Sequence, residues 1–298
     1  MTKQKQVVLV TGASVGLGLQ IAKDLIQGDR YHLILTSRSA SRHRFGDEQI
    51  LRSPTIWIRD LDVSKNEQID ALLTEIDTKL GGVDILINNA GISERSTVED
   101  SGYDYRLRQI SVNYLGPFEL IARVLPGMRE KRRGHIINIS SSGGFMAMPT
   151  MSAYSASKFA LEAASEALWY EMRPWGIKVT LVVPGFINSE GYLNTSETHH
   201  SHEAALDSTS TYFEHYKGMG SLVLGGMKRT KSTNQSVSEA ILRVINRRNP
   251  PLRVFVTIES WILFWVRKVL PPTLYHWFIF KMLPNHNHWG LQSLNSKE

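Results

Sequence analysis

The sequence predicts a doubly wound α/β fold, in which a parallel sheet is covered by helices on both faces. Short, almost continuously apolar runs alternate with stretches of helical spacing, which is typical of strands buried on both sides. A glycine-rich turn joins the first apolar run to the first helical stretch. The 298 residues are 42% hydrophobic, so the chain can form a large core.

The same patterns place the individual elements. Apolar runs predict strands at residues 7–11, 32–36, 55–58, 83–87, 135–139 and 178–183, with a last strand at 252–256. Periodic stretches predict helices at residues 17–26, 67–80, 118–129, 157–172 and 236–249. Because parallel strands need long crossover connections, this alternation indicates one sheet with right-handed crossovers.

Two regions depart from the alternation. Residues 186–235 are rich in Ser, Thr, Asn, Gly and His and show little periodicity, so we expect a substrate loop or lid there. Residues 257–298 form an aromatic and basic extension, in which 258–283 predict two short amphipathic helices.

Composition excludes several classes of site. The chain has no cysteine, so disulfides, thiolate metal sites and cysteine nucleophiles are excluded, and the formal net charge is +6. The polar start of the chain predicts no secretory signal, and no run of 18 uncharged apolar residues occurs. We therefore expect a cytoplasmic protein, with peripheral membrane association as one interpretation of residues 258–283.

The glycine-rich turn has the spacing of a phosphate-binding loop. Gly12 allows the tight turn, Gly16 lets a pyrophosphate approach the backbone, and Gly18 lets the helix pack closely. Ser14 and Leu17 lie in the same turn, at the positive end of the predicted helix. The sequence therefore predicts a dinucleotide site.

The end of the second predicted strand indicates which dinucleotide binds. Sites selective for NAD place an acidic residue here, whereas this chain has Ser37 followed by Arg38. A hydroxyl and a guanidinium suit a 2′-phosphate, so NADP is favoured over NAD.

A candidate catalytic pair lies at the start of a predicted helix. Tyr154 and Lys158 are four residues apart and therefore share a face. An ammonium near a phenol favours the phenolate, so we expect Lys158 to lower the pKa of Tyr154. The preceding strand ends in Ser140, Ser141 and Ser142, where a hydroxyl can hydrogen-bond a substrate carbonyl.

Together these motifs resemble the classical short-chain dehydrogenase/reductase family over residues 6–190. Ser141 lies thirteen residues before Tyr154, as in that family. Asn113 stands where the family has its structural and proton-relay asparagine. Further family positions that contact the cofactor correspond to Asp62, Val63, Asn89, Ala90, Gly91, Pro184, Gly185, Ile187 and Ser189, the last replacing a more usual threonine.

The resemblance implies an NADP-binding catalytic domain of Rossmann type at residues 1–256 and an oxidoreductase that interconverts a carbonyl and an alcohol. Tyr154 is then the general acid or base, Ser141 positions the substrate oxygen, Lys158 tunes Tyr154 and holds the ribose, and Asn113 supports a proton relay. The alternatives are a nucleotide-binding scaffold without turnover and a membrane-peripheral protein.

The resemblance extends more weakly to the hydroxysteroid and retinol dehydrogenase-like branch, which implies a lipophilic substrate; a small keto compound and a carrier-bound acyl substrate are the alternatives. The extension has three interpretations: a lid, a subunit contact or a peripheral membrane contact. The family implies a homodimer or homotetramer. We expect no metal site, since His199, His200 and His202 are typical of a polar loop, and no nucleic-acid partner.

Overall fold

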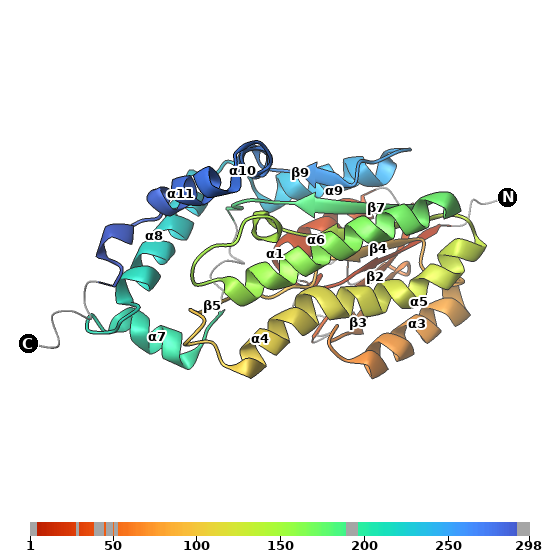
Figure 1. Cartoon of the computed structure of the whole chain (residues 1–298). Coiled ribbons are helices and arrows are strands. Elements are labelled where there is room, and N and C mark those ends of the chain that lie inside the picture. The colour runs from red at the N-terminus through yellow and green to blue at the C-terminus, as the bar shows by residue number, and fades with distance from the viewer. Residues whose placement is uncertain are drawn as a thin grey trace, which may run out of the picture.

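The computed structural model describes residues 5–27, 30–38, 45, 50, 53–188 and 196–290 (Figure 1). At its centre is a parallel seven-stranded sheet with the order β3-β2-β1-β4-β6-β7-β9. The strands are β1 (Gln6–Val10), β2 (Tyr31–Ser37), β3 (Ile56–Asp60), β4 (Ile85–Asn88), β6 (Gly134–Ile139), β7 (Ile177–Val183) and β9 (Arg253–Phe255). All seven predicted strands are confirmed.

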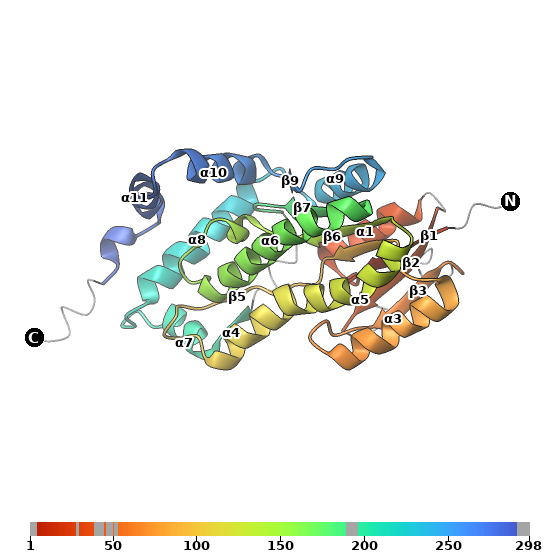
Figure 2. The same ribbon diagram turned by 45° about the vertical axis from the view of Figure 1, so that its right-hand side comes forward.

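Helices cover both faces of this sheet (Figure 2). One face carries α3 (Asn66–Leu80), α5 (Gly116–Glu130) and α6 (Ser152–Met172), and the other carries α1 (Gly16–Ile26) and α9 (Asn234–Asn246). The strands are almost wholly buried because both of their faces are covered. The predicted fold class and its five helices are confirmed, although α6 begins five residues earlier than expected.

The strand order places a crevice at the carboxyl ends of β1 and β4. β1 pairs with β2 on one side and with β4 on the other, so the connections wind in opposite directions from this point. In open α/β sheets, ligands bind outside the carboxyl ends of the strands at such a reversal. The glycine-rich turn follows β1 directly and therefore lies in this crevice.

Residues 186–235 are more regular than predicted. The described part of this segment contains α7 (His199–Leu206) and α8 (Phe213–Arg229), so the expectation of an aperiodic loop is wrong there. Glycines, which are poor helix formers, obscured the pattern of α8. Two of them allow close packing: a Cβ on Gly226 would lie 2.5 Å from the Phe186 ring, and one on Gly218 would lie 2.7 Å from the Pro284 carbonyl oxygen.

Other short elements were also not predicted. They are α4 (Tyr103–Ile110), the π-helical turn η2 (Ser111–Leu115), the 3₁₀ turns η3 (Ser142–Gly144), η4 (Arg173–Trp175) and η6 (His286–His288), and a two-stranded parallel pair, β5 (Glu94–Arg95) with β8 (Ser196–Glu197). Elements of two to eight residues leave little periodicity to detect. The pair β5–β8 fixes the chain after β4 to the start of α7.

The C-terminal extension forms the two expected helices, α10 (Ile258–Val269) and α11 (Pro272–Met282). Pro271 and Pro272 separate them, since proline cannot continue the first helix. Figures 1 and 2 show α7, α8, α10 and α11 gathered at one end of the molecule. Within the described residues, none of the helices has the length and apolar character that a membrane crossing requires.

Candidate active site

The turn between β1 and α1 is shaped to receive an anion. Gly12 and Gly16 have φ angles of 65° and 56°, in the left-handed region that favours glycine. A Cβ on Gly18 would lie 2.2 Å from the Gly12 carbonyl oxygen, whereas one on Gly16 would meet nothing within 4 Å. Helix α1 also has no side-chain cap at Val15 and no acidic residue in its first turn. Its N-terminus therefore presents positive potential to an open space.

Thr11 and Asn89 hold this turn against the end of β4. The Thr11 hydroxyl accepts hydrogen bonds from the backbone N–H groups of Asn89 and Ala90, each at 3.0 Å. The Asn89 amide donates to the carbonyl oxygens of Thr11 and Gly12, also at 3.0 Å. Asn89 and Ala90 thus lie beside the turn. Ser14 is buried in the turn and Leu17 is half-buried at the start of α1.

Ser37, Arg38 and Asp62 meet at the carboxyl ends of β2 and β3. The Leu61 N–H donates to the Ser37 carbonyl oxygen at 2.8 Å, which aligns the two strand ends. Arg38 is exposed and its charge acts on Asp62. Partial burial raises the pKa of Asp62, but hydrogen bonds from Ser64 and the charge of Arg38 outweigh it, so the pKa lies below its usual value.

Val63 follows Asp62 and is buried. It packs against the start of α5, where a Cβ on Gly116 would lie 2.4 Å from the Val63 carbonyl oxygen. Val63 therefore belongs to the core between the sheet and the helices α3 and α5.

Tyr154 and Ser141 meet across the end of β6. The Ser141 hydroxyl lies close enough to the Tyr154 phenol to lower its pKa. The backbone N–H of Gly143 donates to the Ser141 hydroxyl at 3.1 Å, which fixes its position. A Cβ on Gly143 would lie 2.9 Å from Cε1 of Tyr154, so the ring packs directly on this glycine. Sequence reasoning missed Gly143, although it stands within the Ser-Ser-Gly-Gly turn.

Lys158 is buried one helical turn after Tyr154. Its ammonium donates to the Ile139 carbonyl oxygen at 2.9 Å. Burial lowers its pKa to about 8, while the Glu162 carboxylate acts in the opposite direction. Glu162 was also missed, although its spacing of four residues from Lys158 was a signal that it shares a face of α6.

The expected effect of Lys158 on Tyr154 is not found. Burial raises the pKa of Tyr154 above its ordinary value, and the hydrogen bond with Ser141 lowers it by less. The Lys158 ammonium is held by the Ile139 carbonyl and does not contribute to this shift. At neutral pH Tyr154 therefore keeps its proton.

Asn113 lies at the centre of η2, fully buried, and clamps the chain after β4. Its amide donates to the Ile92 carbonyl oxygen at 2.8 Å and to the Ser157 hydroxyl at 3.0 Å, and its oxygen accepts from the Ile92 N–H at 2.9 Å. A Cβ on Gly91 would lie 3.3 Å from the Asn113 oxygen and 3.8 Å from the Lys158 nitrogen. Asn113, Gly91 and Lys158 are therefore neighbours.

The segment after β7 closes the site from the other side. The Gly185 N–H donates to the Thr257 hydroxyl at 3.0 Å, and Pro184 is buried. Ile187 packs on the core face that carries α1 and α9. Ser189 lies outside the described residues.

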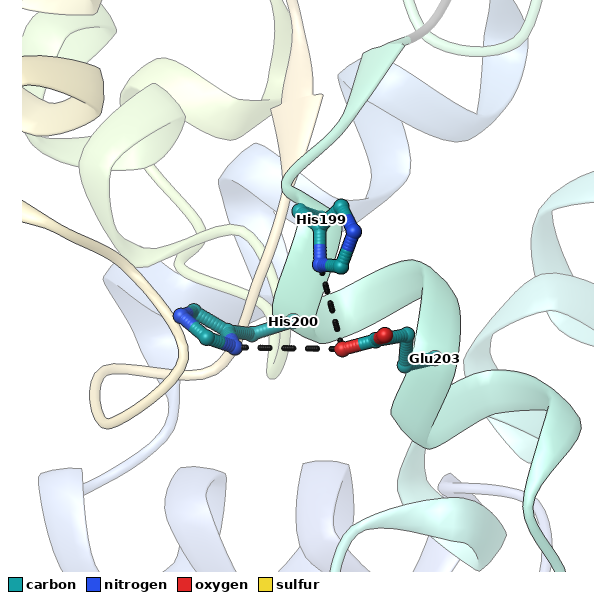
Figure 3. Close-up of side chains that lie close together, drawn as sticks. All are labelled: His199, His200 and Glu203. Atoms are coloured by element: carbon teal, nitrogen blue, oxygen red, sulfur yellow. Dashed lines mark ion pairs between the residues drawn. The ribbon is translucent and has the colours of Figure 1, made fainter.

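His199, His200 and Glu203 form a separate cluster on α7 (Figure 3). Their ligand atoms lie within 4.8 Å of one another, and the Glu203 carboxylate is 3.1 Å from His199 Nδ1 and 4.0 Å from His200 Nδ1. All three side chains are exposed, at 63–80%. They come from an ordered helix rather than the expected polar loop, and solvent screens their interactions.

Comparison with known proteins agrees with this geometry. The family described as short chain dehydrogenase matches residues 6–200. The chain is 35% identical to a 3-ketodihydrosphingosine reductase of Bacteroides thetaiotaomicron over 87% of this chain and 94% of the relative. It is 33% identical to dehydrogenase/reductase SDR family member 7B of Xenopus laevis, over 91% of this chain and 80% of the relative.

Solved structures show the same architecture. A short-chain dehydrogenase from Streptomyces avermitilis has a TM-score of 0.76 and 28% identity, and the match covers 94% of this chain and 98% of that one. The closed form of a serine dehydrogenase complexed with NADP⁺ has a TM-score of 0.67 and 25% identity over 84% of this chain and 94% of that one. These relatives agree with the expected hydroxysteroid and retinol dehydrogenase-like branch. The chain belongs to the short-chain dehydrogenase/reductase family and is an NAD(P)-dependent oxidoreductase.

Proposed function

We propose that this protein uses NADPH to reduce the ketone of a long-chain, lipophilic substrate. The observation that carries the proposal is that Tyr154 and Ser141 both lie against Gly143, beside Lys158, at the carboxyl end of β6. A proton donor and an oxygen-binding hydroxyl thus stand together at the edge of the sheet where the phosphate turn also lies.

The residues present fit a nicotinamide dinucleotide. The uncapped start of α1 and the open space at Gly16 suit the pyrophosphate. Ser37 and Arg38 suit the 2′-phosphate of NADP, and Asp62 and Val63 suit the adenine. The nicotinamide half would be held by Asn89, Ala90, Gly91, Tyr154, Lys158, Pro184, Gly185, Ile187 and Ser189. When bound, the cofactor supplies a hydride to the carbonyl carbon.

The side chains supply and guide the proton. Because burial raises the pKa of Tyr154, the phenol is protonated at neutral pH and can donate to the developing alkoxide. Ser141 hydrogen-bonds the same oxygen and is itself fixed by the Gly143 N–H. With a pKa of about 8, Lys158 is mostly charged at pH 7, and its ammonium lies where it would hold the ribose of the cofactor. Asn113 orders the neighbouring backbone and a path for proton resupply.

Two observations support a lipophilic ketone. The 3-ketodihydrosphingosine reductase of B. thetaiotaomicron, whose name describes reduction of a keto group on a long-chain base, matches 87% of this chain over 94% of its own length. The extension also packs aromatic side chains beside the site: Phe264 of α10 lies 5.4 Å from the Phe145 ring, which follows η3. Apolar side chains packed this close to Ser141 suit a substrate with an alkyl chain.

The test compares Tyr154→Phe with Tyr170→Phe, a control that alters an exposed tyrosine on the same helix. NADPH oxidation is followed by absorbance with 3-ketodihydrosphingosine, a long-chain alkyl ketone and a water-soluble short-chain ketone. We expect Tyr154→Phe to lose at least about a hundredfold in kcat, while NADPH fluorescence titration and thermal unfolding stay unchanged. A near-normal rate in Tyr154→Phe, or no turnover by the wild type with any of these ketones, would overturn the proposal.

A further inference from the structure

Helix α10 presents an apolar stripe to solvent. Its exposed side chains recur at helical spacing, so they lie on one face: Ile258, Trp261, Ile262, Trp265 and Val269. The two tryptophans are 52% and 48% exposed, and Val269 is 74% exposed. The opposite face packs on the protein through Leu263, Phe264 and Leu270. The helix is therefore apolar on both faces, although only one of them is covered.

Helix α11 extends this surface. It packs on the body through Tyr275 and Ile279, whereas Leu274, Trp277, Phe278, Phe280 and Met282 are exposed. Between α10 and α11 lies an open apolar groove of about 390 Å³. Its lining is formed by Trp261, Ile262, Trp265, Val266, Val269, Leu270 and Phe278. A continuous exposed apolar patch of this kind marks a contact surface rather than ordinary surface composition.

The charges around the patch have one sign. Within residues 257–290 the only carboxylate side chain is that of Glu259, which is hydrogen-bonded to Thr230 of the main body at 3.4 Å. Lys268 and Lys281 are exposed beside the patch, whereas the Arg267 guanidinium lies over the Phe159 and Tyr275 rings. An apolar face with tryptophans, bordered by cations, complements a layer whose surface is anionic and whose interior is hydrocarbon.

The patch is directly connected to the site. The Thr257 hydroxyl, which caps α10, accepts the Gly185 N–H at 3.0 Å, and Ser260 Oγ donates to the Val183 carbonyl oxygen at 3.1 Å. Phe264 packs on Phe145, one residue after the turn that follows Ser141. Both segments that border the proposed substrate site therefore touch the first three turns of α10.

We propose that α10 and α11 dock flat on an anionic membrane surface and that the lipophilic substrate reaches the site from that surface. The second part rests on the proposed function. A second copy of the chain fits less well, because a two-fold contact through this patch brings Lys268 and Lys281 of the two copies together. Since neither helix is long enough to cross a bilayer, the contact is interfacial.

Vesicle flotation of the full chain tests the docking. We expect binding to vesicles of phosphatidylcholine with phosphatidylserine, and weaker binding to phosphatidylcholine alone or at high salt. Trp261→Ser with Trp265→Ser should reduce binding at least about tenfold, and Lys268→Glu with Lys281→Glu should remove the preference for phosphatidylserine. Tyr103→Ser with Tyr170→Ser, which removes two exposed aromatic side chains elsewhere, should bind as the wild type does.

Three outcomes would overturn the docking: no flotation of the wild-type chain, flotation unchanged in the tryptophan variant, or a shift of that variant from dimer to monomer in sedimentation without vesicles. A separate assay tests whether the lipophilic substrate reaches the site from the membrane surface. The tryptophan variant should keep its rate on a water-soluble ketone and lose rate on a long-chain ketone held in vesicles; equal loss on both would overturn delivery. If no ketone is reduced by the wild type, the proposed function fails while flotation still decides the docking.

Discussion

Glu162 acts on Lys158 from one helical turn away. Burial lowers the pKa of the Lys158 ammonium to about 8, and the Glu162 carboxylate opposes that effect. Glu162 is itself buried, and one of its oxygens accepts from Arg253 Nε of β9 at 2.7 Å. The same guanidinium donates to Glu166 at 2.6 Å. The charge of a proposed catalytic lysine thus depends on a carboxylate that would touch neither substrate nor cofactor.

Replacing Glu162→Gln should move the alkaline limb of the activity profile to lower pH. Loss of the carboxylate lowers the pKa of Lys158 further below 8, so the ammonium loses its proton at a lower pH. The measurement is kcat/KM for ketone reduction between pH 6 and 9.5. Glu166→Gln is the matched control, because it also removes a partner of Arg253 but is one turn further from Lys158. Identical profiles for the two variants would contradict the assignment.

Gly143→Ala should impair turnover without unfolding the chain. The added Cβ would stand 2.9 Å from the Tyr154 ring and 3.5 Å from the Ser141 hydroxyl, so the ring must move away from its partner. We expect kcat to fall roughly tenfold to a hundredfold, since small displacements of reacting groups cost that much. Gly127→Ala on α5 is the control, because its Cβ would meet nothing within 4 Å. Equal rates in the two variants would show that the ring packing is unimportant.

Arg38→Asp should exchange the cofactor preference. The exposed guanidinium suits a 2′-phosphate, whereas a carboxylate repels it and accepts hydrogen bonds from a ribose hydroxyl. We expect KM for NADPH to rise at least about tenfold, with NADH used as well as or better than before. Steady-state rates with both cofactors and one ketone measure this. A variant that still prefers NADPH would indicate that Ser37 and its surroundings carry the selectivity.

His135 should make the fold sensitive to acid. Burial, together with the charge of Lys178, lowers the pKa of this histidine to about 3, so the native state stays neutral where the unfolded state takes up a proton. The contribution of neutral His135 to the free energy of unfolding is complete above about pH 6.5 and is lost as the pH falls toward 3. Between pH 6.5 and 5 the free energy of unfolding falls by roughly 2 kcal/mol for this reason. Urea unfolding at pH 7 and pH 5 should show a smaller difference for His135→Gln than for the wild type. The exposed His202→Gln should match the wild type.

The main layout of the fold was predictable because its signals are local. Each central strand is a short apolar run, and each crossover helix has a periodic apolar face. Gly12, Gly16 and Gly18 were predictable for the same reason, since a tight strand–turn–helix unit imposes backbone demands that few other residues meet. Their φ angles and close contacts agree with these roles.

What could not be predicted depends on tertiary contacts. Helix α8 has four glycines and a weak local preference for helix, yet it is ordered by Tyr216, whose hydroxyl donates to Asp100 at 2.5 Å. The sequence motif also could not predict the shift in the pKa of Tyr154. The spacing of Tyr154 and Lys158 predicts that they are neighbours, but the effect of burial on Tyr154 and the contact of the ammonium with the Ile139 carbonyl depend on the tertiary fold.

The hydroxyl of Thr257 serves two structures at once, since it accepts both the Ser260 N–H at the start of α10 and the Gly185 N–H after β7. The C-terminal extension is therefore connected by a hydrogen bond to the segment after β7. Deleting it from residue 257 onward leaves the Gly185 amide without its acceptor and uncovers apolar strand ends. An exchange of this segment between related enzymes should therefore carry the residues around Gly185 together with Thr257. A chain shortened at residue 257 loses this hydrogen bond near the site as well as the exposed surface of α10 and α11.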